Sequence, residues 1–460
     1  MSDAEEVKVS LKVMMNRQKS KVLFAESDSD FADIVLSFLT LPLGRIVKVL
    51  EKHYGDEAPT IGSLNNLYHT LANLDSSHFV TEGAKQTLLD SASSFEAEYR
   101  MLKVDISDSP PAEYFVCSNC SSKRFRCASI YYDSISCSNC KDRMSKVVDT
   151  SDAPSDGLFT KHTSSFIVSN DLHILPKETG FLTTVRILGI TVRDMENAET
   201  IKVDFGFTEI MKLLKASLTS PTPLSDLILN KTTTAEMNNT PVYTPVVGSQ
   251  RNQYTRYIGC FSLTLMVQKS TGKLLCAQTD ENFVEFLFNL LSIPLGRVEH
   301  LLAGKNTCFK AINNLHRSTT DLIDDKHFKN ANAKNWLRLP VLIHGSISTN
   351  LFILARPSAA EVPYRGSPYS SDKFPRGKGV YLEGSRSYIV KDDLSVEPYC
   401  FVTLLSSFRQ RRIVMSDVEE VELEIGTDEL LGILKASLTS TTVLSDALLT
   451  LTKQPKREEL

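Results

Sequence analysis

LKVMMNRQKSKVLFAESDSDFADIVLSFLTLPLGRIVKVL, residues 11–50, aligns without a gap on LTLMVQKSTGKLLCAQTDENFVEFLFNLLSIPLGRVEHLL, residues 263–302. A second segment, LKASLTS, is identical at residues 214–220 and 434–440. Two segments that recur in the same order indicate an internal duplication. Each residue can therefore be compared with its counterpart in the other copy.

Each copy opens with a predicted β-hairpin, because β-rich residues 7–15 and 21–26 flank a polar stretch, as do 260–267 and 273–278. Apolar residues then recur at helical spacing, beginning with Phe31, Ile34 and Val35. Each copy closes with an amphipathic helix that contains LKASLTS. We therefore expect an α+β fold, made of two homologous tandem lobes of β-hairpin plus helices.

The PLGR motif, Pro42-Leu43-Gly44-Arg45 and its repeat at residues 294–297, follows each predicted helix. Proline lacks an N–H and is preset near the helical φ, so it ends one helix and suits the first turn of the next. The motif predicts a helix-helix corner. A binding role for Arg45 and Arg297 is the alternative, because both copies keep the arginine.

The domain boundaries follow from the repeat and from composition. We expect a first repeat lobe at 7–230, a linker rich in Thr, Asn and Pro at 231–256, a second repeat lobe at 257–452 and a polar tail at 453–460. The chain has 460 residues and a net charge of −4, so its surface as a whole is not built for nucleic acid or anionic membranes.

The location of the protein is predicted from the targeting signals that the sequence lacks. The acidic N-terminus lacks a secretory signal, and no apolar run is long enough to span a bilayer. We expect a soluble protein of the cytoplasm or nucleus, not secreted and without membrane contact. In that reducing setting the nine cysteines are expected to be thiols or metal ligands.

The strongest chemical signal is the tetrapeptide CSNC, which occurs at residues 117–120 and 137–140. The spacing C-x2-C-x16-C-x2-C is typical of a four-thiolate zinc site, in which two knuckles bring four sulfurs into a tetrahedron. We predict one structural Zn²⁺ per chain in a zinc-ribbon-like module at about 113–146. The predicted ligands are Cys117, Cys120, Cys137 and Cys140.

Two other functions of these cysteines, redox chemistry and catalytic zinc binding, have less support in the sequence. Redox chemistry needs a strand-to-helix setting that lowers one thiol pKa, and no helical pattern follows either pair. Catalytic zinc needs an open coordination position, and four thiolate ligands leave none.

Copy 1 is 27 residues longer than copy 2 across this region, so the module was either inserted into copy 1 or lost from copy 2.

The ribbon also carries a small basic cluster, Lys123-Arg124-Phe125-Arg126, which mixes cations with an aromatic ring. Surfaces that bind nucleic acid have this composition. With four thiolates and one Zn²⁺ counted, however, the module has a net charge near only +2. Nucleic-acid binding through these four residues is therefore the alternative to a protein partner.

The PLGR corners, the LKASLTS helix and a module of paired CxxC motifs in copy 1 alone together resemble a plant family of uncharacterised proteins, the domain-of-unknown-function family 674. The resemblance covers about residues 7–451. It implies a plant protein with tandem related regions, and it supplies no catalytic residue, no cofactor-binding residue and no established activity.

The function predicted from the residues is non-enzymatic, because no Ser/His/Asp, Cys/His or carboxylate constellation is matched in both copies. His78 and His327 correspond between the copies, and each is expected to shape a turn. We expect an interaction or scaffold protein whose lobes pack as an internal pseudo-dimer and whose partner is a protein. An enzyme with a site between the lobes is the second alternative.

Overall fold

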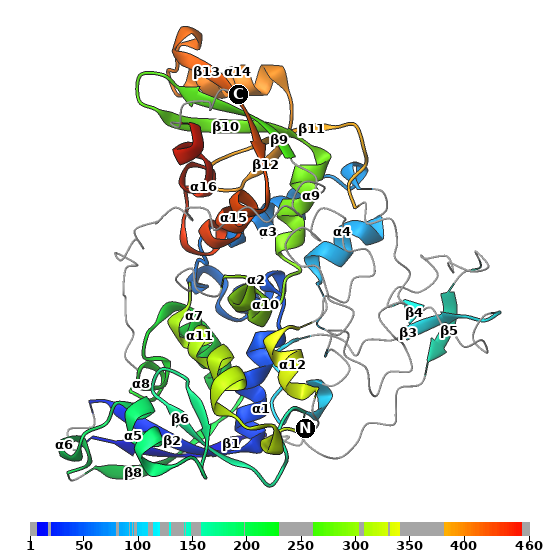
Figure 1. Ribbon diagram of the computed structural model, residues 1–460. Coiled ribbons are helices and arrows are strands. Elements are labelled where there is room, and N and C mark those ends of the chain that lie inside the picture. The colour runs from blue at the N-terminus through cyan, green and yellow to red at the C-terminus, as the bar shows by residue number, and fades with distance from the viewer. Residues whose placement is uncertain are drawn as a thin grey trace, which may run out of the picture.

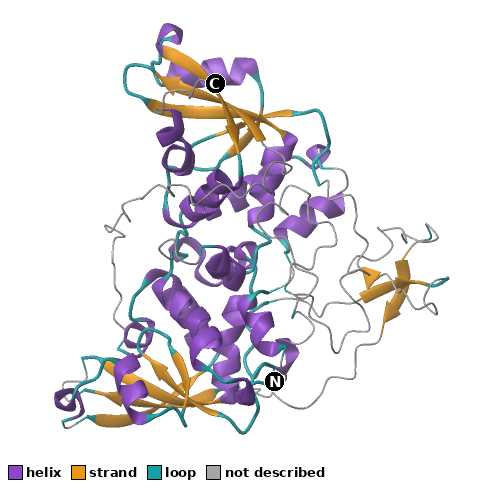
Figure 2. Ribbon diagram, in the orientation of Figure 1, coloured by secondary structure: helices purple, strands orange, loops and turns teal. Residues whose placement is uncertain are grey.

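The computed structural model has two five-stranded sheets at opposite ends of the molecule, with helices packed between them (Figure 1). Figure 2 shows the same arrangement coloured by secondary structure. The structure describes residues 7–16, 20–79, 82–91, 93, 95, 99–108, 114–119, 128–129, 142, 144–148, 158–196, 198–229, 261–302, 308–329, 332–340 and 381–452.

The first sheet has the order β7-β6-β2-β1-β8, with every neighbouring pair antiparallel. It contains β1 (Val9–Met15), β2 (Val22–Asp28), β6 (Ser165–Ser169), β7 (Ile174–Pro176) and β8 (Glu199–Phe205). The predicted hairpin is confirmed, since β1 pairs directly with β2.

The second sheet repeats this order strand for strand, as β12-β11-β10-β9-β13. It contains β9 (Phe261–Gln268), β10 (Lys273–Asp280), β11 (Ser387–Val390), β12 (Val396–Pro398) and β13 (Val418–Ile425). The α+β class and the two related regions are therefore confirmed.

The helices of copy 1 are α1 (Ser29–Ser37), α2 (Leu43–Tyr54), α3 (Leu64–Asn73), α4 (Glu82–Leu89), α5 (Phe181–Leu188), α6 (Val192–Met195), α7 (Phe207–Thr219) and α8 (Pro223–Ile228), with the short turns η1 (Phe38–Thr40), η2 (Gly55–Glu57), η3 (Ser76–His78) and η4 (Tyr99–Met101). In α7 the predicted buried face is confirmed: Ile210, Leu213, Leu214, Ser217 and Leu218 are all buried.

The helices of copy 2 are α9 (Glu281–Leu290), α10 (Leu295–Leu301), α11 (Lys310–Arg317), α12 (Ala333–Arg338), α14 (Phe401–Gln410), α15 (Thr427–Thr439) and α16 (Val443–Thr452), with the turns η6 (Ser318–Leu322), η7 (Asp325–His327) and η9 (Met415–Asp417). Equivalent caps begin the first helix of each copy. Asp28 accepts a hydrogen bond from the Phe31 amide, and Asp280 accepts one from the Phe283 amide.

The two PLGR motifs begin α2 and α10, as predicted, and they also pair with each other. Their prolines form an antiparallel bridge at the centre of the molecule. The Leu43 amide donates to the Ile293 carbonyl at 3.0 Å, and the Leu295 amide donates to the Leu41 carbonyl at 3.0 Å. The corner is therefore the place where the two copies join.

Glycine is required at this junction because the two backbones approach closely. A Cβ added at Gly296 would lie 2.8 Å from the Leu337 carbonyl oxygen and 3.0 Å from the Leu39 carbonyl oxygen. The arginine of each motif is buried, since Arg45 and Arg297 are each only 4% exposed. Both observations favour the structural interpretation of PLGR over a binding role.

After the PLGR corner, the chain of each copy continues toward the sheet of the other copy. Helix α3 of copy 1 contacts α9 and β12, and α11 of copy 2 contacts α7. The Asn66 amide donates to the Asp393 carbonyl at 3.4 Å, and the equivalent Asn314 amide donates to the Asp171 carbonyl at 2.9 Å. One apolar core runs through both copies. A repeat in the sequence is therefore not the same as a lobe in space.

The core of copy 2 contains a buried carboxylate at a position where copy 1 has an apolar side chain. Glu299 in α10 is 2% exposed, and neither of its carboxylate oxygens has a hydrogen-bond partner among the described residues. Val47 stands at the equivalent position of copy 1. Burial raises the pKa of Glu299 to about 8, because the charged form is poorly solvated there.

The close contact at the junction predicts that Gly296→Ala destabilises the protein. The new methyl group would press on two backbone carbonyls that have little room to move, which typically costs about 1–3 kcal/mol. Urea unfolding measures the effect. Gly180→Ala is the matched control, because a Cβ there meets no atom within 4 Å. Equal midpoints for Gly296→Ala and the wild type would contradict the junction geometry.

Glu299→Val, which installs the residue of copy 1, is expected to stabilise the protein at neutral pH. Because its folded-state pKa is raised from 4.5 to about 8, the contribution of Glu299 to stability is most favourable below pH 4.5 and is lost as the pH rises toward 8. The loss at pH 7 is about 3 kcal/mol. Urea unfolding between pH 5 and 8 should show this slope in the wild type and a flatter one in the variant. Glu57→Gln, at an exposed position, is the control.

Candidate functional site

Two straps lead into the inner strands β6 and β11, and a buried carboxylate anchors each of them. In the first strap, residues 158–165, the amide and hydroxyl of Thr160 donate to Asp33 at 2.9 and 2.8 Å. In the second strap, residues 381–387, the amides of Tyr381 and Leu382 donate to Glu285 at 2.8 and 3.2 Å. Burial raises the pKa of Asp33 to about 6, although hydrogen bonds from Thr160 oppose the shift.

Each strap pairs with a histidine from the other copy. The Lys161 amide of the first strap donates to the His327 carbonyl at 2.9 Å, and the Glu383 amide of the second strap donates to the His78 carbonyl at 2.9 Å. The crossing of the chains therefore places His327 of copy 2 beside the first sheet and His78 of copy 1 beside the second.

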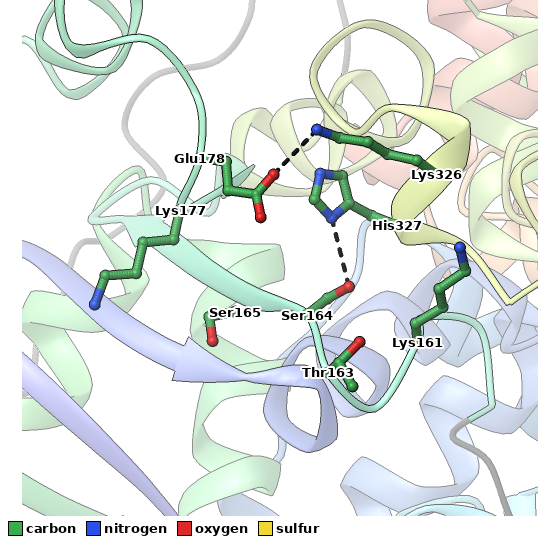
Figure 3. A pocket seen from close by; sticks show the side chains of 8 residues that line it. All are labelled: Lys161, Thr163, Ser164, Ser165, Lys177, Glu178, Lys326 and His327. Carbon is green, nitrogen blue, oxygen red and sulfur yellow. Dashed lines mark hydrogen bonds and ion pairs between the residues drawn. The ribbon is translucent and has the colours of Figure 1, made fainter.

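A pocket of about 420 Å³ lies where the first strap meets η7 of the other copy (Figure 3). We call it the junction pocket. Its lining comes from the first strap, the end of β7 and η7, and is almost entirely polar: Lys161, Thr163, Ser164, Ser165, Lys177, Glu178, Lys326 and His327.

His327 is the least exposed of the residues that line the junction pocket, at 7%. Its Nδ1 lies 3.4 Å from the Ser164 hydroxyl. Its Nε2 has no hydrogen-bond partner among the described residues. Burial, and next the charge of Lys326, lowers the pKa of His327, so the ring favours the neutral form.

The three lysines of the junction pocket are paired to different degrees. Lys326 lies 3.0 Å from Glu178, and Lys177 lies 2.9 Å from Glu26 and points away from the other lining side chains. Lys161 forms no ion pair with any described residue, and its side chain lies on the opposite side of His327 from Lys177 (Figure 3). The pocket therefore has an excess of positive charge.

The equivalent position in the other lobe is arranged differently. Arg386 replaces Ser164, and its guanidinium lies 3.2 Å from Nδ1 of His78 and 2.9 Å from the carboxylate of Glu383. Glu383 in turn replaces Lys161. An arginine-glutamate pair thus stands beside His78, whereas beside His327 stand a serine and a lysine that has no ion-pair partner among the described residues.

A second surface feature is present in both copies. Helices α5 and α14 begin with exposed apolar side chains: Phe181 is 78% exposed and Leu182 75%, while Phe401 is 63% and Val402 68% exposed. Figure 1 shows the two helices at opposite ends of the molecule. In α14 only Phe408 is buried, against the outer face of the second sheet.

The predicted metal ligands fall mostly outside the described residues. Cys117 ends β3 (Tyr114–Cys117), which pairs with β4 (Ala128–Ser129) and β5 (Met144–Val148) in the order β4-β3-β5. The other predicted ligands, Cys120, Cys137 and Cys140, and the basic cluster Lys123, Arg124, Phe125 and Arg126 lie outside the described part of the chain. The zinc site and its nucleic-acid contacts stay predictions.

Sequence reasoning assigned His78 and His327 to turns and did not find the junction pocket. Both residues do end short turns, η3 and η7. Their neighbours, however, come from the other copy and lie at least 160 residues away along the chain. The sequence did show that Arg386 of copy 2 stands where copy 1 has Ser164. This difference points to a site only once the straps are known to face these histidines.

Comparison with known proteins gives one family and no closer relative. Among the described residues, no helix is long and apolar enough to cross a membrane. No curated protein and no solved structure matches the chain. A family model described as "Protein of unknown function (DUF674)" matches residues 5–350 and 365–460. The match spans nearly the whole chain and both copies, so this protein belongs to the DUF674 family.

Proposed function

We propose that this protein is a non-enzymatic scaffold whose lobes form an internal pseudo-dimer and whose two ends bind protein partners through α5 and α14. The observation that carries the proposal is the repeated exposure of Phe181 with Leu182 and of Phe401 with Val402. Large apolar side chains that gather on a surface mark interaction sites in many proteins. Here the feature is present at the start of both equivalent helices.

The charges beside these helices favour a partner with acidic residues. Arg186 lies in α5, while Arg409 lies in α14 and Arg411 and Arg412 follow it directly. All four arginines are exposed. An apolar segment flanked by carboxylates would bury the exposed phenylalanine of either helix, and its carboxylates would pair with the arginines. This charge pairing would increase the specificity of binding and the rate of association. We therefore infer an acidic, amphipathic protein segment as the occupant of each face.

An enzyme with a site between the lobes is less well supported. The two copies share one continuous cluster of apolar side chains, beside which Arg45, Arg297 and Glu299 are buried. The junction pocket contains a serine and a histidine, but Ser164 Oγ is 3.4 Å from His327 Nδ1, and no described carboxylate contacts Nε2 to orient the ring. Activation of a serine requires both a close base and an orienting group. The geometry favours binding over catalysis.

We also propose that Cys117, Cys120, Cys137 and Cys140 hold one structural Zn²⁺, and that the protein works in the cytoplasm or nucleus. The support for zinc is the cysteine spacing, together with the position of Cys117 at the end of a strand in a small three-stranded sheet. Nucleic-acid binding through the basic cluster stays an alternative prediction, since no described residue bears on it.

The scaffold proposal predicts that Phe181→Asp and Phe401→Asp together strongly reduce partner binding. Quantitative affinity capture from an extract of the source cells should recover a partner protein with the wild type. Each single variant should recover the same partner in reduced amount. The double variant should recover at least about 10-fold less, as expected when interface anchors are lost.

Val7→Asp is the matched control for this experiment, because Val7 is also exposed but lies outside both helices. It should retain the partner at the wild-type level. A double variant that captures the same proteins as the wild type would refute the role of α5 and α14. Loss of the partner in Val7→Asp would show that the capture is not specific to these faces.

The metal proposal predicts one zinc ion per chain by elemental analysis. Cys137→Ser should lose the metal, because three thiolates hold Zn²⁺ much more weakly than four. Cys400→Ser, which changes an exposed cysteine before α14, should keep it. A purified protein that contains no metal and still folds normally would rule the site out.

A further inference from the structure

We propose that the junction pocket is a binding site for a small phosphate monoester, and that copy 2 has lost the equivalent site. The proposal is independent of the docking faces on α5 and α14. It rests on the donors that line the pocket, on the charge excess, and on the different side chains at the equivalent position beside His78.

The junction pocket presents hydrogen-bond donors from several directions. Nε2 of His327 is buried in the pocket wall without a partner among the described residues. The hydroxyls of Thr163, Ser164 and Ser165 come from the first strap, and the ammonium groups of Lys161 and Lys326 come from opposite copies. A phosphate group offers three strong acceptor oxygens and up to two negative charges, which suits a pocket whose lining carries several such donors.

A phosphate would satisfy groups that the protein leaves unsatisfied. A buried imidazole nitrogen without a partner loses free energy, which a ligand oxygen can recover. Lys161 supplies a charge that no described carboxylate neutralises, whereas Glu178 already neutralises Lys326. The phosphate is therefore expected to contact Lys161 first.

The size of the pocket points to an ester rather than to the free ion. A volume of about 420 Å³ is within the range of small-molecule sites, and far larger than a phosphate ion requires. The lining contains no large apolar side chain, so the remainder of the ligand should also be polar. A phosphorylated sugar or polyol fits these conditions.

Copy 2 gives an internal comparison for this proposal. Beside His78, the Arg386 guanidinium supplies the positive charge that a ligand would seek, but Glu383 neutralises it at 2.9 Å. The arginine also contacts Nδ1 of the histidine, at 3.2 Å. The positive charge beside His78 is thus already neutralised within the chain, whereas Lys161 of copy 1 has no carboxylate partner among the described residues.

The site is tested by isothermal titration calorimetry of the full chain with glucose 6-phosphate as the probe. We expect the wild type to bind one equivalent. Lys161→Met should weaken binding at least 10-fold, because an unpaired cation is removed at an exposed position. Lys161→Glu with Ser164→Arg, which copies the side chains beside His78, should abolish binding. Thermal melting would confirm that each variant folds.

Arg386→Ser is the matched control, since it changes the equivalent residue in copy 2 and should leave the first site unaltered. Glucose tests whether the phosphate is needed, and gluconate tests whether any anion suffices; neither should bind within 10-fold of glucose 6-phosphate. The proposal is overturned if the wild type does not bind at millimolar concentration, if Lys161→Met binds as tightly as the wild type, or if gluconate binds equally well.

Discussion

The backbone pairing of the two PLGR corners is the contact on which the rest of the molecule depends. Reciprocal hydrogen bonds, from the Leu43 amide to the Ile293 carbonyl and from the Leu295 amide to the Leu41 carbonyl, join the copies at the centre of the molecule. The small side chain of Gly296 lets the backbones approach within the distance that these bonds need. Because α2 and α10 start from this point, the helices that follow are directed across the junction.

The crossing has a consequence for the surface as well as for the core. It brings η7 of copy 2 to the first strap and η3 of copy 1 to the second. Each junction is therefore built from residues that are far apart in the chain, and a change in either copy alters both lobes. The buried carboxylates of Asp33 and Glu285 accept hydrogen bonds from the backbone amides of the two straps and so hold the straps in place. On this common frame, the side chains of the straps were free to diverge.

Divergence between the copies separates two kinds of feature. The exposed phenylalanines of α5 and α14 are alike in both copies, as expected of a repeated docking surface. The residues beside the two histidines differ, with Ser164 and Lys161 in one copy and Arg386 and Glu383 in the other. Features that are alike in both copies suit a scaffold that binds a partner at each end. Features that differ suit a binding site that is present in only one copy.

Local sequence patterns were enough to predict the duplication, the α+β class, the hairpins, the corner at each PLGR motif and the buried face of α7. These follow from local periodicity and from the limits on proline, which act over a few residues and repeat in both copies. The copy against which each helix packs, and the residues that face His327, became known only from the three-dimensional fold. Such contacts depend on the path of the whole chain through the junction, and residue types at short spacing carry no record of that path.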